Sequence, residues 1–118
     1  MRLTETEVQD VPVVLMDGRL DSRSAEGCAN QLLKLVEDGR LALILDMSEV
    51  DYIGAAGLRV LLMLIVRATP LGVQVRLCNT QKAFRDVLRI SELADRFPVY
   101  PNVDSAVEGI GECVLVGS

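Results

Sequence analysis

Few residues of this sequence could do chemistry, and those that could are carboxylates, hydroxyls and one arginine near the middle of the chain. The sequence contains no histidine, which removes the usual general base and the commonest metal ligand. Asp21, Asp46 and Ser48 fall where predicted strands or helices end, and such side chains there most often accept backbone N–H groups, contact with a partner being the alternative. Since no base, metal-binding pattern or oriented nucleophile accompanies them, the sequence predicts no enzyme, no metal and no cofactor.

The segment 54–59, Gly-Ala-Ala-Gly-Leu-Arg, follows a buried strand and opens a helix. A glycine at this junction leaves the first N–H groups of the helix unpaired, a site for a phosphate, a carboxylate or a partner's side chain. Small residues would serve tight helix packing equally well. No GxxxxGK[ST] pattern is present, so this is not a Walker-type loop. Arg59 either covers the core with its aliphatic stem or meets an acidic partner.

The cysteines Cys28, Cys78 and Cys113 are odd in number and show no CxxC spacing. Reduced thiols are therefore expected rather than a disulfide framework or a zinc site. Cys28 falls on the apolar stripe of a predicted helix and is expected in the core. A redox link between Cys78 and Cys113 stays open, and it requires α-carbons within about 7 Å of each other.

Length, charge and hydropathy restrict the class of protein. A chain of 118 residues predicts a single domain, residues 1–118. A formal net charge of -5 without a dense Lys/Arg block argues against a nucleic-acid surface. The N-terminus lacks an apolar signal core, and the longest apolar segment, 58–66, is interrupted by Arg59 and too short to cross a bilayer. The sequence thus predicts a cytoplasmic protein without a membrane segment.

The elements that must position these residues alternate along the chain. Segments 3–8 and 11–16 predict a hairpin that turns at Gln9-Asp10, followed by a loop over 17–22 in which Asp21 or Ser22 caps the next helix. That helix ends at Gly39, and its apolar positions recur three or four apart: Ala25, Cys28, Ala29, Leu32, Leu33 and Val36. Leu41 to Leu45 predicts a fully buried strand, reached by a parallel crossover, and an acidic loop then leads to Gly54.

The second half continues the alternation. The helix from Gly54 ends near Thr69 before Pro70, and a strand follows in which Val73, Val75 and Leu77 alternate with Gln74 and Arg76. A helix over 81–93 places Phe84, Val87 and Leu88 inward, and residues 97–101, with two prolines, give only a short edge strand. A last helix over 106–115, capped by Asp104 or Ser105, is weakened by Gly109 and Gly111. Together these elements predict one α/β domain.

Several of these segments, in this order, resemble the STAS domain, and most closely the bacterial anti-sigma factor antagonists. The resemblance runs from Gly18-Arg19-Leu20-Asp21 through Leu45-Asp46-Met47-Ser48 and Tyr52-Ile53-Gly54-Ala55-Ala56-Gly57-Leu58-Arg59 to Phe84-Arg85-Asp86-Val87-Leu88 and Phe97-Pro98-Val99-Tyr100. It implies a mixed, mostly parallel sheet of four to five strands with an N-terminal β-hairpin and about four helices. It also implies binding to an anti-sigma factor of the serine kinase type, and so transcription regulation by partner switching.

In those antagonists a serine at the start of the second helix is phosphorylated by the same kinase, which dissociates the complex. By alignment on Gly57-Leu58, the phosphoacceptor position falls on Ala55, which has no hydroxyl. We therefore expect a binder that the family's phosphorylation does not switch off, acting as a monomer or weak homodimer. The expected contact residues are Asp21, Ser22, Gly54, Ala55, Ala56, Gly57 and Arg59, with Asp46 and Ser48 in a supporting loop. The alternatives are a small-ligand or nucleotide sensor and an interaction module of another signalling pathway.

Overall fold

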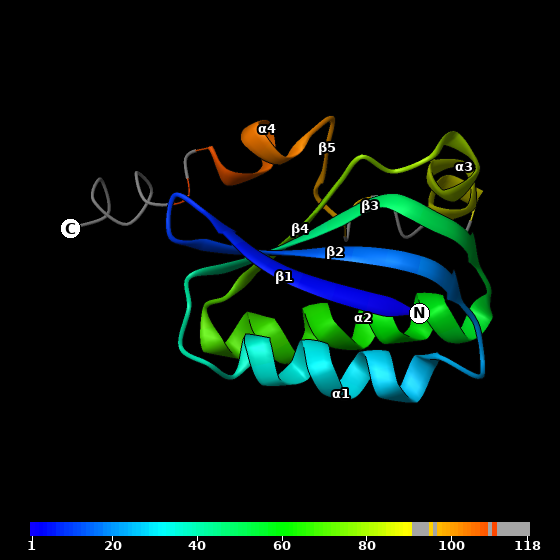
Figure 1. Ribbon diagram of the computed structural model, residues 1–118, viewed down its shortest axis with the longest axis horizontal. Coiled ribbons are helices and arrows are strands. Elements are labelled where there is room, and N and C mark those ends of the chain that lie inside the picture. Colours follow the sequence, from blue (N-terminus) through cyan, green and yellow to red (C-terminus); the bar gives the residue numbers. More distant parts are fainter. Residues whose placement is uncertain (91–94, 96, 109, 111–118) are drawn as a thin grey trace.

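The computed structural model describes residues 1–90, 95, 97–108 and 110, in which a five-stranded sheet is flanked by helices. The strands, in spatial and chain order, are β1 Arg2–Val8, β2 Val11–Leu20, β3 Ala42–Ile53, β4 Gln74–Cys78 and β5 Val99–Tyr100. The α-helices are α1 Ala25–Val36, α2 Ala55–Ala68, α3 Lys82–Ile90 and α4 Val103–Val107, and η1 Thr69–Leu71 is a 3₁₀ turn. Figure 1 shows α1 and α2 on one face of the sheet and α4 on the other.

The predicted N-terminal hairpin is confirmed. β1 pairs antiparallel with β2 up to Val8 and Val11, and Gln9 and Asp10 both have positive φ, at 52° and 65°. Two successive residues with positive φ form the tight turn that matches the twist of paired strands. The predicted loop over 17–22 is wrong in its first part, because β2 continues to Leu20 and pairs parallel with β3 up to Ile53.

β3 is longer than predicted, and the expected acidic loop after Leu45 belongs to it. The pairing with β2 slips twice: Leu15 and Asp17 face Asp46 and Glu49, and Gly18 and Arg19 face Val50 and Tyr52. Each slip inserts one extra residue, a β-bulge. The residues that face the core are therefore Met47, Val50 and Ile53. They are spaced by three, so the sequence of this segment does not show the alternation by two that indicates a strand. Leu41, predicted buried, precedes the strand and is 51% exposed.

One face of the sheet carries the main core, built with α1 and α2. The predicted stripe of α1 is confirmed, since Cys28, Leu32 and Val36 are buried and the other members are partly buried. α2 buries a continuous row of small and branched residues: Gly57, Val60, Leu61, Leu64 and Ala68. It ends at Ala68, close to the predicted position, where Pro70 enters η1. None of the helices in the described ranges combines the length and the apolar character that crossing a membrane requires.

The opposite face is covered in part by α4, which follows the edge strand β5. The predicted edge strand is confirmed as β5, beside β4. α4 begins earlier than predicted, and its cap is Asn102, which accepts from Ser105 N while Ser105 Oγ accepts from Asn102 N. Asp104 and Ser105 are therefore not the N-cap. Because α4 covers this face, Arg76 is buried at 8% exposure, where simple alternation predicts an exposed side chain. Gly109 and the part of the predicted helix beyond residue 110 lie outside the described residues.

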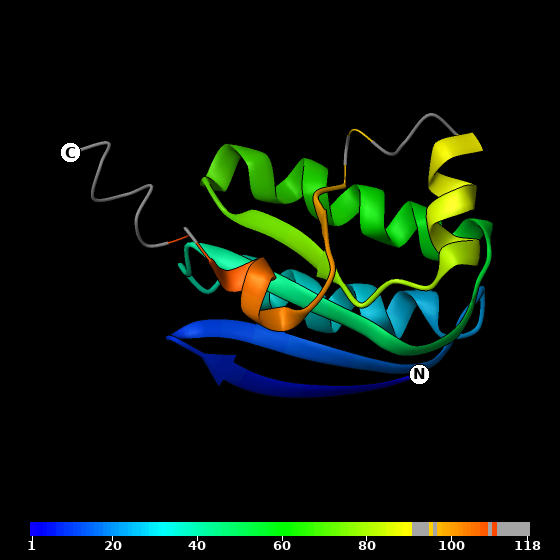
Figure 2. The ribbon, with the colours of Figure 1, turned by 90° about the horizontal axis from the view of Figure 1, so that it is seen from above.

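α3 lies near the end of β3, close to the start of α2 (Figure 2). It spans Lys82–Ile90 rather than 81–93, and residues 91–93 lie outside the described residues. Phe84 and Leu88 are buried as predicted, but Val87 is 39% exposed, because it borders an open cleft instead of the core.

The two described cysteines are core residues. Cys28 and Cys78 are both buried free thiols. Burial raises the pKa of Cys28 to about 11 and that of Cys78 to about 12. Both side chains are therefore neutral at pH 7 and act as small apolar groups in the core. Cys113 lies outside the described residues, so its link to Cys78 stays open.

Candidate functional site

The amino-terminal end of α2 is accessible at the surface. Ala55, the first helical residue, is exposed, and its neighbours Gly54 and Ala56 are partly exposed. Gly54 occupies the N-cap in an extended conformation, and the first turn has neither a side-chain cap bond nor an acidic residue. The N–H groups of this turn thus lack a side-chain acceptor, and the positive end of the helix is uncompensated by a local carboxylate.

Arg59 lies one helical turn after Ala55. Residues four apart on a helix share a face, with β-carbons about 5–6 Å apart, and both side chains are exposed. Among the described residues, Arg59 forms neither an ion pair nor a side-chain hydrogen bond. An exposed guanidinium group is compatible with contact to an acidic partner and also with a stem that covers the core, so both roles that the sequence left open stay open.

Gly57 lies beneath this surface. It is buried, and a β-carbon at this position would lie 2.7 Å from Leu20 O and 2.8 Å from Leu20 Cγ. The same Leu20 carbonyl accepts the N–H of Gly54 at 3.1 Å. Gly57 therefore allows α2 to approach the end of β2, and its expected place among the contact residues is revised, because a buried backbone offers a partner no surface.

Substituting Gly57 by alanine is expected to lower the free energy of unfolding by about 1–3 kcal/mol, the range for overpacked sites. The cause is that Leu20 O belongs to the backbone and cannot rotate away. The matched control is Gly27→Ala in the first turn of α1, where a β-carbon meets nothing within 4 Å, and a gain of about 0.5–1 kcal/mol is expected there. Urea unfolding of both variants measures the difference, and equal effects would contradict the packing role.

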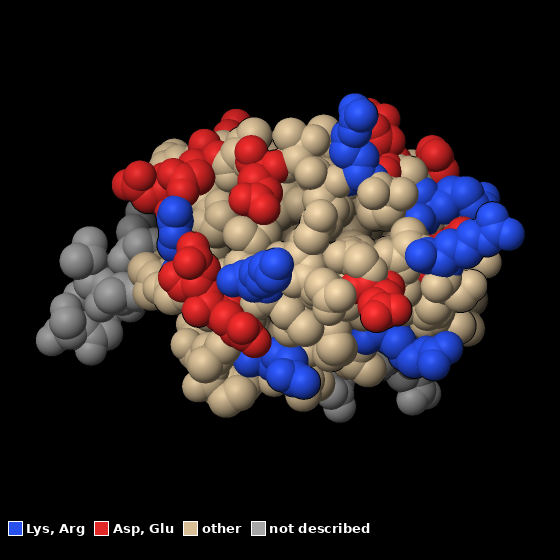
Figure 3. Space-filling view, turned by 60° about the horizontal axis from the view of Figure 1, so that its bottom comes forward, with Lys and Arg blue, Asp and Glu red and all other residues tan. Residues whose placement is uncertain are grey.

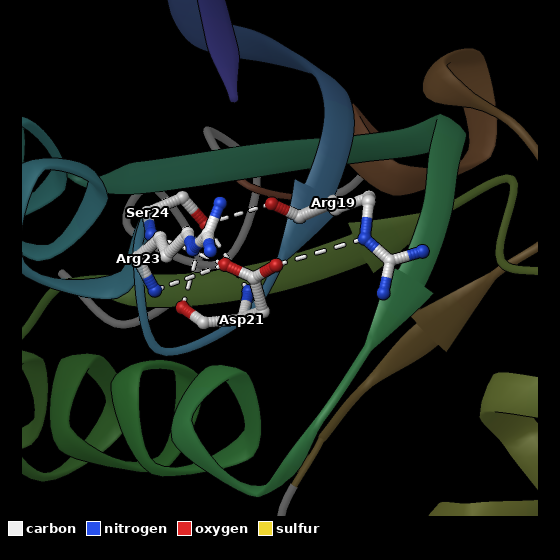
Figure 4. A network of polar contacts seen from close by, with 4 residues as sticks. All are labelled: Arg19, Asp21, Arg23 and Ser24. Carbon is white, nitrogen blue, oxygen red and sulfur yellow. Dashed lines mark hydrogen bonds and ion pairs between the residues drawn. The ribbon is translucent and has the colours of Figure 1, made fainter.

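Asp21 follows β2 and organises the turn before α1. Its Oδ1 accepts from Arg23 N at 3.0 Å and from Ser24 N at 3.3 Å, while Ser24 Oγ accepts from Asp21 N at 3.1 Å (Figure 4). The hydrogen bond from Arg23 N is the main cause that lowers the pKa of Asp21. The helix N-cap itself is Ser24. The prediction of Asp21 or Ser22 as N-cap is therefore wrong in position, although Asp21 does accept N–H groups; Ser22 is simply exposed.

Arg19 and Tyr52 belong to the same surface, although no pattern in the sequence indicates this. They are cross-strand partners of β2 and β3, and the guanidinium carbon of Arg19 lies 4.3 Å from the centroid of the Tyr52 ring. Tyr52 in turn lies over Gly54, since a β-carbon at Gly54 would be 3.0 Å from Tyr52 Oη. Arg19, Tyr52 and the start of α2 are thus contiguous. Predicting this contact from the sequence requires the pairing register of β2 and β3, and the two bulges shift that register.

Asp46 and Ser48 do not join this site. They lie in β3 at the first bulge, where Asp46 Oδ1 accepts from Ser48 N at 3.0 Å and from Asn79 Nδ2 at 3.1 Å. Seven strand steps separate Asp46 from Ile53 at the end of β3, up to about 23 Å at about 3.3 Å per residue. The expected supporting loop is therefore a strand irregularity, and Asp46 supports the link from β3 to the residue after β4.

A small apolar cleft opens between the end of β3 and α3. Its volume is about 250 Å³, and Gln81 closes one side by donating from Nε2 to Val50 O at 3.0 Å. Its lining is mostly apolar and includes Val50, Tyr52, Ile53, Phe84 and Val87. Ligand pockets commonly measure about 300–1,000 Å³, so this cleft is smaller than most of them.

Comparison with known proteins places this geometry in context. The family model described as STAS domain matches residues 3–106. A protein of Bordetella bronchiseptica described as a candidate anti-sigma factor antagonist, BtrV, is 29% identical over 106 residues, covering 90% of this chain and 91% of that protein.

Two solved structures share the fold. An anti-sigma factor antagonist from Mycobacterium paratuberculosis has a TM-score of 0.83 at 24% identity, covering 93% of each chain. A candidate antagonist from Thermotoga maritima has a TM-score of 0.85 at 18% identity, covering 92% of this chain and 94% of that chain. The predicted α/β architecture, with a mixed five-stranded sheet and an N-terminal hairpin, is confirmed.

Proposed function

Since the chain belongs to the STAS domain family and is similar to anti-sigma factor antagonists, we propose that it docks onto an anti-sigma factor of the serine kinase type and so releases a sigma factor. The docking surface consists of Ser22, Gly54, Ala55, Ala56 and Arg59. Asp21 holds the turn that carries Ser22, and Gly57 holds α2 close to β2.

The observation that carries this proposal is the exposure of Ala55 at the start of α2. Two alanines and a glycine expose little side chain there, so a partner can approach the backbone closely. A patch of this size fits a transient interface, which buries less surface area than most specific protein–protein interfaces. The position aligned with the phosphoacceptor serine of the family carries a methyl group, so the kinase has no hydroxyl to modify at this place.

The proposal is tested by titrating the purified chain against each kinase-type anti-sigma factor encoded in the same genome, with ADP or ATP present. One of them is expected to bind, and the complex is expected to persist in ATP. Ala55→Gln, which extends a longer neutral side chain from the surface, is expected to weaken binding about tenfold, equivalent to about 1.4 kcal/mol.

The matched control is Val66→Gln near the other end of α2, where Val66 is 56% exposed. This variant is expected to bind as the wild type does, and thermal unfolding verifies that both variants fold. The proposed function fails if no kinase-type anti-sigma factor binds the wild type, or if the two glutamine variants weaken binding equally.

A further inference from the structure

Arg19 lies at the edge of the docking surface, and its guanidinium group is held on two sides. Its Nε lies 3.6 Å from Asp21 Oδ2, and its guanidinium carbon lies over the Tyr52 ring, 4.3 Å from the centroid. Figure 4 shows Asp21 facing Nε, whereas the two terminal nitrogens point away from Asp21. These two contacts therefore restrict the orientation of the group before any partner arrives.

The terminal edge of this guanidinium is available. The Arg19 side chain is 61% exposed, and within the described part of the chain no hydrogen bond or ion pair uses its two terminal nitrogens. These nitrogens present parallel N–H donors, the arrangement that matches both oxygens of a carboxylate. Because Asp21 and Tyr52 already restrict the side chain, less conformational entropy is lost when a carboxylate binds.

The surroundings favour an acidic group. Arg23 and Arg59 are also exposed, and the first turn of α2 contains no acidic residue. In Figure 3, several Lys and Arg side chains gather at the right-hand end of the molecule, where α1 and α2 begin, with a few Asp and Glu among them. A chain with a net charge of -5 thus carries several exposed arginines at this end, and complementary charge there favours correct encounter with an acidic group.

We propose that Arg19 is a specificity-determining contact and that its terminal nitrogens bind an aspartate or glutamate side chain of the anti-sigma factor. This inference rests on the proposed function, since it assigns the chemistry of the partner at the same surface. Tyr52 and Asp21 act as positioning residues: the ring supports the guanidinium from below, and the carboxylate holds its Nε side.

The test measures the affinity of variants for the kinase-type anti-sigma factor that binds the wild type. Arg19→Glu is expected to weaken binding about thirtyfold or more, since it loses a charge-assisted pair and sets two like charges opposite each other. Arg19→Lys, which keeps the charge but not the fork, is expected to lose about three- to tenfold. Arg67→Glu, at an exposed arginine near the far end of α2, is the matched control and is expected to stay within twofold.

A charge swap identifies the partner group. Replacing acidic residues of the anti-sigma factor one at a time by lysine is expected to restore binding of Arg19→Glu in one case, a coupling that additive effects do not produce. Circular dichroism verifies the fold, and Arg19→Gln serves if the glutamate variant does not fold. If the wild type binds but the Arg19 variants stay within twofold, this inference is overturned while the proposed function stands. If the wild type binds no such factor, both are overturned.

Discussion

Substituting Arg76 by methionine is expected to lower the free energy of unfolding by about 3 kcal/mol, an effect in the range for breaking a buried charged hydrogen-bond network. Arg76 is 8% exposed and donates to Ala106 O at 2.9 Å, to Glu108 O at 3.0 Å and to Gln74 Oε1 at 2.8 Å. Methionine fills a similar volume but donates nothing, so two carbonyl groups at the end of α4 lose their partner.

Burying a charge can also cost more free energy than its new interactions contribute. Arg76 forms no ion pair among the described residues, and its charge faces carbonyl oxygens and the Tyr100 ring, 5.0 Å from the guanidinium carbon. Truncation leaves those carbonyl oxygens in place, on backbone that α4 cannot withdraw without exposing Ala106 and Val107. The desolvation of the carbonyl groups is thus retained while their hydrogen bonds are lost, which makes the substitution destabilising.

The control for this prediction is Arg67→Met, at an exposed arginine in the last turn of α2. Its expected effect is within about 0.5 kcal/mol, as for surface substitutions without special contacts. Equilibrium urea unfolding of both variants gives the comparison. Equal stability of Arg76→Met and the wild type would mean that α4 is held by its apolar contacts alone.

The elements that the sequence predicts well are those with local signals. Gln9-Asp10 indicates a tight turn, the stripe ending at Val36 indicates a helix, and Pro70 indicates where α2 ends, because each signal acts on its own backbone. The second half of β3 carries no such signal. Its bulges are imposed by pairing with β2, so its inward residues are spaced by three, and a regular alternation is not visible in the sequence.

The burial of Arg76 was missed for a related reason. Alternation in β4 assigns Gln74 and Arg76 to the face opposite Val75, but it cannot tell that α4, thirty residues later in the chain, covers one of them and leaves the other exposed. A polar residue in an alternating strand therefore indicates on which face of the sheet its side chain lies, but not whether that side chain is exposed. Which residue is covered depends on tertiary packing.

The residues of the candidate site fall into the same two groups, those with a local signal in the sequence and those placed by tertiary packing. The strand-to-helix junction at Gly54, with an accessible Ala55, followed from local sequence. The contact of Arg19 with Tyr52 depends on the register of two strands, and the burial of Gly57 depends on how closely α2 approaches Leu20. Asp46 and Ser48 were placed near the site because a loop was expected there. A strand of full length instead separates them from it.

Restoring a hydroxyl at the start of α2, by Ala55→Ser, is expected to convert the chain into a kinase substrate. Ala55 is exposed and is the first residue of the helix, so a serine there adds one oxygen without steric conflict. Incubation with the cognate kinase-type anti-sigma factor and ATP is expected to incorporate about one phosphate per chain, measured by intact mass. The wild type is expected to incorporate none.

Phosphorylation of Ala55→Ser is expected to weaken the complex about a hundredfold or more, because it places a charge of about -1.5 to -2 and a bulky group at the contact surface. Ala83→Ser, at an exposed alanine in the first turn of α3, is the matched control and is expected to remain unmodified and bound. Stoichiometric phosphate on the wild type, which would have to lie outside residues 54–57 because these contain no hydroxyl, would contradict the reading of Ala55. If phosphorylated Ala55→Ser stayed bound, charge at this position would not control docking, and the missing hydroxyl would not explain a persistent complex.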